Sequence, residues 1–235
     1  MVNKSIAIIP ARLGSKGFPG KNTNFFNGKP LVSWTIEAAL LSDSFSKIVV
    51  SSDDEAVLEI ADSFGDIVKA YKRRRSLSHD RVPGIAVALD AIGNEKESYE
   101  FGLFLQPTSP LRTSDDIKAI LRLAQQKNYK SVVSITEATK SPNWMYSFDR
   151  NSHKVEKYEK ENALIPLRQN TKSLYHLNGA LYLFQIAWLL KSREFITDVT
   201  RGYIMPGYKS VDIDSKSDFL LAELISSKLN IFENL

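Results

Sequence analysis

One segment decides the fold, and it reads Ile6-Ala7-Ile8-Ile9-Pro10-Ala11-Arg12-Leu13-Gly14-Ser15-Lys16-Gly17-Phe18-Pro19-Gly20-Lys21-Asn22. Its first residues form a short apolar run rich in isoleucine, which is typical of a buried strand. The residues that follow combine three glycines with three basic side chains. Such a loop can bring backbone N–H groups and positive charges close to a phosphate chain. The segment therefore predicts that a nucleoside triphosphate binds at the end of the first strand.

Two better-known phosphate-binding motifs do not match this loop. A Walker loop needs a glycine five residues before the glycine of its Gly-Lys pair, and a serine or threonine after the pair. The pair Gly20-Lys21 has Ser15 and Asn22 in those places. A dinucleotide fingerprint needs a second glycine two residues after the first, whereas Lys16 follows Gly14 at that distance. The remaining alternative is a basic surface turn between the strand and the next element.

The composition is that of a soluble globular chain with a mild positive charge. The 235 residues carry a net charge of +4, and much of the excess is local, in the first loop and in Lys72–Arg75. This distribution favours a small anionic ligand over nucleic acid, which calls for a broad basic face. The absence of cysteine excludes disulfides and cysteine-based metal sites. Neither a membrane span nor a signal-peptide pattern is evident, so we expect a cytoplasmic protein.

Strand and helix patterns alternate along the chain. Apolar runs predict strands at 6–9, 47–51, 101–105, 131–135 and 180–184, and amphipathic patterns predict helices at 31–41, 54–64, 84–92, 115–127 and 215–229. This alternation predicts an α/β fold, namely a Rossmann-like, doubly wound, mostly parallel sheet with right-handed crossovers. In such sheets ligands bind beyond the carboxyl ends of the strands.

Local signals refine the helices. Asp53 and Ser114 stand where N-cap residues are expected, and the acidic residues after Asp53 would complement the helix dipole. The helical spacing of the last helix places Phe219, Leu220, Leu224 and Ile225 on one face.

The regular alternation is interrupted between residues 138 and 175. Two short runs, 145–148 and 155–158, flank the turn-like Asp149-Arg150-Asn151-Ser152, and irregular polar chain follows them. This pattern predicts an aromatic hairpin, which is too small to bury its own side chains. We therefore expect one domain over residues 1–235, with 138–175 as an inserted subdomain that contacts a second subunit and the acceptor.

Six segments, taken in order, resemble the acylneuraminate cytidylyltransferases, also called CMP-sialic acid synthetases. The first loop is the most specific of them, together with Gln106-Pro107-Thr108-Ser109-Pro110-Leu111-Arg112. The supporting segments are Gly28–Leu31, Val50–Glu55, Leu177–Ala180 and Val211–Asp214. The resemblance covers nearly the whole chain and implies a fold of the nucleotide-diphospho-sugar transferase type. It also implies transfer of CMP from CTP to the anomeric hydroxyl of a nine-carbon 2-keto sugar acid, with release of pyrophosphate.

The resemblance implies the following nucleotide-site residues. Catalysis of an in-line attack on phosphorus is mostly positioning and electrostatic stabilisation, and the implied catalytic residues are Arg12, Lys21, Asp212 and Asp214. Nucleotide contacts are implied for Ala11, Arg12, Gly14, Ser15, Lys16, Lys21, Asn22, Arg73 and Asp80. Two carboxylates two residues apart face one side of an extended segment and suit Mg²⁺. The alternative for this pair is a solvated strand end with Asp214 capping the last helix.

The resemblance also implies acceptor contacts, and each has a structural alternative. The implied residues are Gln106, Thr108, Ser109, Arg168, Asn178 and Gly179. The two prolines at 107 and 110 fix the backbone of the loop that begins at Gln106. The alternative for this loop is a rigid turn in which Ser109 caps a short helical step. Arg112 is expected to close this loop structurally. Asn178-Gly179 fits a tight turn as well as a contact to a sugar hydroxyl.

Two segments depart from the family pattern. Val82-Pro83-Gly84 replaces hydroxyl residues that commonly face the nucleoside, which makes the cytosine preference less secure than triphosphate binding. His176 replaces an arginine in the acceptor region, so the substrate could be a related nonulosonic acid such as legionaminic acid.

The sequence therefore predicts a Mg²⁺-dependent cytidylyltransferase that activates a nonulosonic acid for surface polysaccharide, such as lipopolysaccharide, and works as a homodimer without nucleic acid or membrane partners. The alternatives are a nucleotidyltransferase for another sugar acid or sugar phosphate, and a non-catalytic nucleotide-binding protein.

Overall fold

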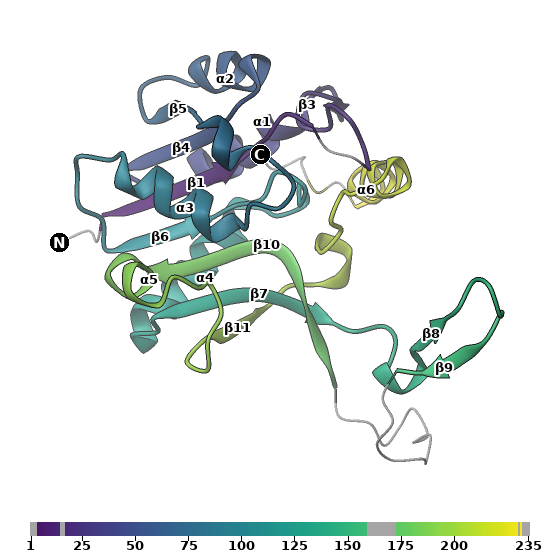
Figure 1. Ribbon diagram of the computed structural model, residues 1–235. Coiled ribbons are helices and arrows are strands. Elements are labelled where there is room, and N and C mark those ends of the chain that lie inside the picture. Colours follow the sequence, from purple (N-terminus) through teal and green to yellow (C-terminus); the bar gives the residue numbers. More distant parts are fainter. Residues whose placement is uncertain (1–3, 15–16, 159–172, 230, 232–235) are drawn as a thin grey trace.

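The main body is a twisted sheet with helices on both faces (Figure 1). The computed structural model describes residues 4–14, 17–158, 173–229 and 231. Within them, seven strands form one sheet in the order β11-β7-β10-β6-β1-β4-β5. These strands are β1 (Ser5–Pro10), β4 (Lys47–Ser52), β5 (Val68–Lys72), β6 (Phe101–Phe104), β7 (Ser131–Glu137), β10 (Tyr175–Gln185) and β11 (Arg201–Ile204). Only β10 runs antiparallel to its neighbours, so the predicted doubly wound, mostly parallel sheet is confirmed.

Strand β1 lies in the middle of the sheet because both of its faces are apolar. Successive side chains of a strand point to opposite faces. Ile6 and Ile8 belong to one buried cluster, and Ala7 and Ile9 belong to the other. The cluster on the Ala7 face is covered by α1 (Leu31–Leu41), α2 (Glu55–Asp62) and α4 (Ser114–Lys127), and the opposite cluster by α3 (Gly84–Gly93) and α5 (Ile186–Ser192).

A third apolar cluster fastens the C-terminal helix α6 (Lys216–Lys228) beside the beginning of α1. Its aromatic members Phe26 and Phe219 meet edge to face, with ring centroids 5.4 Å apart. Phe26 belongs to a small ribbon of β2 (Phe25–Phe26) and β3 (Lys29–Pro30). The helix buries Phe219, Ala222 and Ser226, whereas the predicted face members Leu220 and Leu224 are exposed. The helix lies at the edge of the body, so only a narrow stripe of it is covered.

Both predicted N-caps are wrong by one residue. Helix α2 is capped by Asp54, whose carboxylate accepts a hydrogen bond from the N–H of Ala56, and α4 is capped by Thr113 in a capping box with Asp116. Asp53 is not available as a cap because its carboxylate accepts the N–H of Leu13 at 2.8 Å.

Strand β10 is longer than the predicted run at 180–184. It begins at Tyr175, and its register against β7 shifts between Leu177 and Tyr182. Gly179 lies in this irregular stretch with a φ of +77°, a left-handed conformation that glycine adopts without strain. Sequence patterns missed β5, β11 and α5. The charged residues of β5 interrupt the apolar run that would have predicted a strand. Strand β11 has only four residues and follows a polar loop, so it gives no clear apolar pattern.

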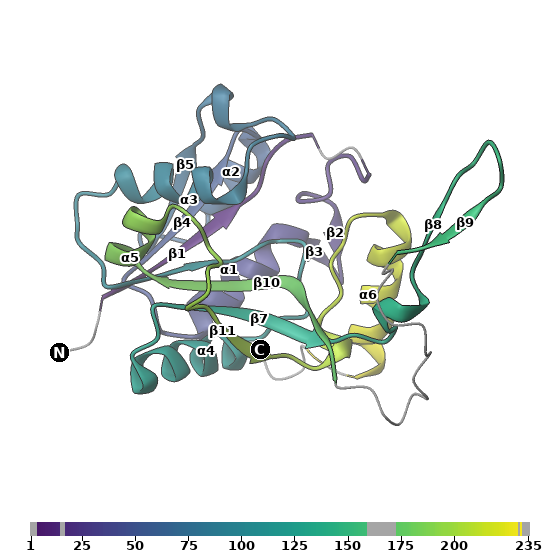
Figure 2. The ribbon, with the colours of Figure 1, turned by 60° about the horizontal axis from the view of Figure 1, so that its bottom comes forward.

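The predicted hairpin consists of β8 (Tyr146–Phe148) and β9 (Val155–Lys157), and it projects from the main body in both ribbon views (Figures 1 and 2). The N–H of Ala138 donates to the carbonyl oxygen of Leu174 at 2.8 Å, so the two ends of the 138–175 segment are paired. Its irregular part at 159–172 lies outside the described residues. The short 3-10 helices are η1 (Arg75–Leu77), η2 (Pro142–Trp144) and η4 (Gly207–Lys209).

Among the described residues, the search for a helix both long and apolar enough to cross a bilayer finds no candidate.

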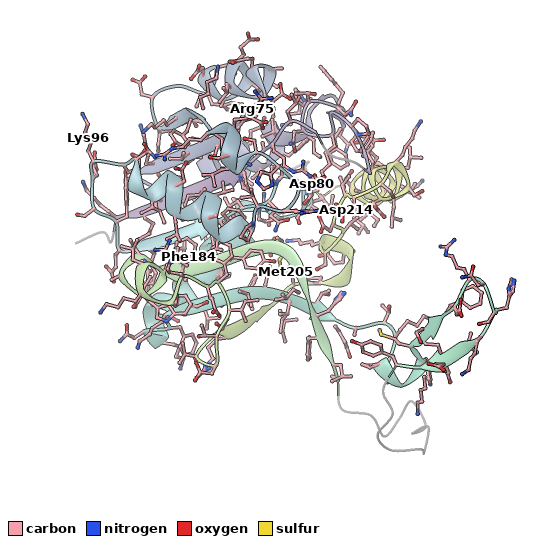
Figure 3. All side chains as sticks on the ribbon, viewed as in Figure 1. Arg75, Asp80, Lys96, Phe184, Met205 and Asp214 are labelled. Carbon is pink, nitrogen blue, oxygen red and sulfur yellow. The ribbon has the colours of Figure 1, made fainter. Side chains whose placement is uncertain are left out.

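Gly102 of β6 provides a test of the sheet packing. A Cβ at this position would lie 2.3 Å from the ring of Phe184, the fully buried partner residue on β10 that Figure 3 labels. We expect Gly102→Ala to lower the free energy of unfolding by about 1–3 kcal/mol through overpacking. Gly93→Ala, at the end of α3 with open space around its Cα, is the matched control and should be neutral or slightly stabilising. Urea unfolding measures both, and equal stabilities of the two variants would contradict the packing described here.

Candidate active site

The candidate site lies where the carboxyl ends of β1, β4, β5 and β6 meet. Because β10 is antiparallel, its amino-terminal part reaches the same edge of the sheet. A cavity of ≈ 250 Å³ opens there. It is lined by Pro10, Arg12, Lys21, Asn22, Arg73, Val82, Gly84, Val87, Phe104, Gln106, Pro107, Thr108 and Asp214. The structure thus brings together predicted nucleotide, acceptor and metal residues from segments up to about two hundred positions apart.

Two cations of the first loop face this cavity, and each already has protein partners. The Arg12 guanidinium forms an ion pair with Asp80 at 2.6 Å and donates to the carbonyl oxygen of Gly14. The Lys21 ammonium donates to the carbonyl oxygen of Ile213 at 2.7 Å and pairs with Asp214 at 3.2 Å. Figure 3 labels Asp80 and Asp214 at this edge of the sheet. Both cations are therefore held in place before a ligand enters.

Side-chain hydrogen bonds fix the backbone of the first loop. The amide of Asn22, a predicted nucleotide contact, donates to the carbonyl oxygen of Arg12 at 3.1 Å and is itself almost fully buried. The N–H of Ala11 donates to Ser51, and its carbonyl oxygen accepts from Ser52, so both backbone groups of Ala11 are used within the fold. The predicted contacts Ser15 and Lys16 lie outside the described residues.

The loop also rests against the segment before α6. A Cβ on Gly17 would lie 2.4 Å from the carbonyl oxygen of Asp214, so only a glycine allows this approach. Gly14, the first glycine of the loop, has a φ of +76°, a left-handed conformation that favours glycine. Because Lys21 contacts the same segment, the loop and the predicted metal ligands form one assembly.

Arg73 lines the cavity and is almost fully buried. Its guanidinium donates to the hydroxyl of Ser51 at 3.0 Å and to the carbonyl oxygen of the same residue. Burial lowers the pKa of Arg73 to about 10, and the Asp53 carboxylate opposes this shift, so the side chain stays charged at neutral pH. Arg73 thus joins the ends of β4 and β5 and adds positive charge to the cavity.

The loop after β6 contributes Gln106 and Thr108 to the cavity wall. The carbonyl oxygen of Thr108 accepts the N–H of Ile213 at 2.8 Å, which links this loop to the segment before α6. Ser109, also predicted to contact substrate, is fully buried, and its hydroxyl has no hydrogen-bond partner among the described residues. Solvent does not reach Ser109 in this conformation, so its predicted contact with the acceptor stays a prediction.

Asn178 and Gly179 fit the turn alternative. The Asn178 amide accepts from Ser134 at 2.5 Å and donates to Ser210 at 2.9 Å, and the side chain is 4% exposed. A Cβ on Gly179 would lie 3.4 Å from a carboxylate oxygen of Asp212 and 3.6 Å from the side-chain oxygen of Gln106. The turn therefore brings the backbone of β10 against both groups. His176 is exposed on the same strand, and Arg168 lies outside the described residues.

Asp212 and Asp214 are exposed on either side of the buried Ile213, as expected for an extended segment. Although solvent reaches Asp212, the surrounding protein removes part of its hydration and raises its pKa. The Asp214 charge adds to this shift, whereas a hydrogen bond from Thr108 opposes it. Asp214 is not the cap of α6, because Ser215 holds that position in a capping box.

The Asp214 charge helps to raise the pKa of Asp212, and a divalent cation between the two carboxylates would relieve this repulsion. In the described part of the chain, no three histidine, aspartate or glutamate side chains are placed so that they could hold a metal ion by themselves. Further ligands of such an ion would have to be phosphate oxygens and water.

Sequence reasoning missed two contributors to the site. Val87 and Phe104 form an apolar part of the cavity wall. The position of Phe104 at the carboxyl end of β6 could have indicated it, whereas Val87 lies on α3 and gave no signal. Asp53 was expected to have a structural role as a cap, and its role is structural, but it anchors the first loop through Leu13 instead.

A family model described as cytidylyltransferase matches residues 6–202, and the chain belongs to this family. An N-acylneuraminate cytidylyltransferase of Streptococcus agalactiae serotype V is 34% identical over 92% of this chain and 52% of its own length. The chain therefore spans about half the length of that relative. A CMP-N,N'-diacetyllegionaminic acid synthase of Legionella pneumophila is 32% identical over 93% of this chain and 94% of its own length.

Solved structures support the fold. A CMP:2-keto-3-deoxy-manno-octonic acid synthetase complexed with CTP superimposes with a TM-score of 0.69. The match covers 96% of this chain and 99% of that chain, at 16% sequence identity, which shows a shared fold.

A substitution at Gly17 tests the contact between the first loop and the backbone of Asp214. We expect Gly17→Ala to weaken CTP binding about tenfold, or about 1.4 kcal/mol, because the methyl group would push the loop and Lys21 away from Asp214. Isothermal titration calorimetry measures the dissociation constant, with Gly93→Ala as a control at a remote glycine. A Gly17→Ala protein that binds CTP like the control would show that the loop is seated by other contacts.

Proposed function

We propose that this chain transfers CMP from CTP to the anomeric hydroxyl of a nonulosonic acid and releases pyrophosphate, in the synthesis of surface polysaccharide such as lipopolysaccharide. One observation supports it above the others: Lys21 of the first loop pairs with Asp214 at the cavity, and Thr108 of the cavity wall forms a hydrogen bond with Asp212. Relatives named for N-acylneuraminate, diacetyllegionaminic acid and pseudaminic acid, at 32–34% identity, support the same substrate class.

In this proposal the cations of the cavity bind the triphosphate. Arg12 offers two N–H groups to phosphate oxygens, whereas Lys21 acts as a point charge. Because protein partners already orient both side chains, less ordering is needed when the nucleotide binds. Negative charge that develops on the bridging oxygen to pyrophosphate would be stabilised by the same cations.

We also propose that Asp212 and Asp214 hold Mg²⁺, which would neutralise charge on the phosphates when bound. The cavity wall that carries Gln106 and Thr108 would orient the acceptor hydroxyl toward the α-phosphorus. Val82 and Gly84 line the cavity where hydroxyl residues were expected, so they offer the nucleoside no side-chain hydrogen bonds. Cytosine selection would then rest on backbone groups and on the other polar side chains.

We propose a homodimer as the working form. The hairpin exposes a row of large apolar side chains, which a two-stranded ribbon cannot bury by itself: Tyr146, Phe148, Val155 and Tyr158 are all more than half exposed. We propose that a second copy of the chain packs against these exposed side chains. Light scattering should give twice the chain mass of 26.5 kDa, and a monomeric mass would overturn this part of the proposal.

The function is tested by pyrophosphate release with CTP, Mg²⁺ and a panel of acceptors. The panel contains N-acetylneuraminate, legionaminic acid, pseudaminic acid, a 3-deoxy-octulosonic acid and a hexose 1-phosphate. We expect turnover with a nonulosonic acid and with CTP in preference to ATP, GTP and UTP. Turnover with the sugar phosphate alone would assign a different nucleotidyltransferase. Binding of CTP without turnover on any acceptor would favour a nucleotide-binding protein.

Asp212→Asn separates a catalytic role from a structural one. We expect kcat to fall on the order of 100-fold, because a charged ligand of the proposed metal is lost. Thermal stability at pH 7 should stay equal or rise. The pKa of Asp212 is raised in the folded state, so its ionised form costs stability, and this cost grows as the pH increases from the unfolded to the folded pKa.

The control for Asp212→Asn is Asp198→Asn, an exposed aspartate in the loop after α5. Activity assays and thermal melts of both variants decide the question. A proportionate loss of activity and stability in Asp212→Asn would assign the carboxylate a structural role.

A further inference from the structure

Arg112 is the largest fully buried side chain among the described residues, and it lies in the turn between β6 and α4. Burial lowers its pKa to about 10, and the more distant Asp116 carboxylate opposes the shift, so the guanidinium is charged at neutral pH. Within the described part of the chain, no carboxylate lies within ion-pair distance of Arg112. Asp116 pairs with Lys209 instead, at 3.0 Å.

The guanidinium joins three elements through their neutral groups. One terminal nitrogen donates to the carbonyl oxygens of Gln106, at 3.2 Å, and Ala180, at 3.0 Å. The other donates to the hydroxyl of Thr35 on α1 at 2.7 Å. Arg112 thus connects the loop after β6, which lines the cavity, with the turn of β10 and helix α1.

The two carbonyl groups belong to residues that set the geometry of the site. Gln106 lines the cavity, and Ala180 follows Gly179, whose Cα lies against both the Gln106 side chain and the Asp212 carboxylate. The Gln106 loop also reaches the segment of Asp212 directly, because the carbonyl oxygen of Thr108 accepts the N–H of Ile213 at 2.8 Å. A shift at Arg112 would therefore change the distance between the acceptor loop and the proposed metal ligands.

The buried charge of Arg112 is not explained by a gain in the stability of the fold. A buried guanidinium loses its hydration, and hydrogen bonds to neutral carbonyl groups recover only part of that loss. The Nε atom of Arg112 is also buried without a hydrogen-bond partner among the described residues, which adds to the cost.

We propose that Arg112 is a positioning residue for the transfer reaction: by holding the carbonyl groups of Gln106 and Ala180, it fixes the acceptor loop relative to Asp212. The proposal rests on the proposed function of the site. Its effect is on the alignment of the reacting groups, so it predicts a loss in kcat larger than any change in the KM for CTP, whose cations Arg12 and Lys21 lie on other elements.

The test compares Arg112→Met, which keeps the length but removes the charge and the donors, with Arg112→Lys, which keeps a charged donor. We expect kcat to fall on the order of 100-fold in Arg112→Met, with Arg112→Lys recovering part of the loss, and the KM for CTP to change less than threefold in both. Thr35→Val removes one partner only and should give a smaller loss. Arg122→Met, at an exposed position of α4, is the control.

All variants are assayed well below their melting temperatures, and the Mg²⁺ dependence of CTP binding is measured by calorimetry. Arg112→Met should require more Mg²⁺ than the wild type, because Asp212 is held less firmly. Unchanged kcat and Mg²⁺ dependence in folded variants would make Arg112 merely structural and overturn the proposal. If Arg112→Met does not fold, Arg112→Lys and Thr35→Val decide in the same way. A wild-type chain without turnover on any acceptor contradicts the proposed function, and the Mg²⁺ titration then decides the role of Arg112.

Discussion

The contact between the first loop and the segment before α6 is the constraint on which the site depends. The loop leaves the central strand β1 with its cations, and the segment of Asp212 and Asp214 arrives about 190 residues later. Lys21 joins them by bonding to the carbonyl oxygen of Ile213, and Gly17 lets the two backbones approach. Without this contact, the cations and the carboxylates would be two separate features of the surface.

The positive charges of the site differ in burial, and this difference separates their roles. Arg12 and Lys21 line the cavity, and protein partners orient both side chains. Arg73 is buried in the cavity wall against the end of β4. Arg112 is fully buried and bonds only neutral groups. The cations proposed to bind phosphate thus line the cavity, whereas Arg112 holds backbone carbonyl groups away from solvent.

Much of the architecture was predictable because local patterns carry it. The isoleucine-rich run of β1, the β-branched run of β4 and the amphipathic pattern of α1 each specify one element by burial alone, and the predicted bounds of α1 agree with the structure. The caps were less predictable. Asp53 and Asp54 have the same local propensity, and only the loop after β1, which takes Asp53 as the acceptor for Leu13, leaves Asp54 to cap α2. Strand β5 was missed because its charged residues satisfy no simple alternation.

The sequence by itself determined the class of fold and the family of cytidylyltransferases, since these depend on residue types and spacing within short segments. The tertiary structure decided which predicted residues line the cavity. Ser109 and Asn178 carry suitable polar groups but are buried, whereas Val87 and Phe104 carry none and line the cavity. It also decided the antiparallel direction of β10, which brings Gly179 to Asp212 and Gln106. Burial and chain direction are properties of the whole packed sheet, and no single segment contains them.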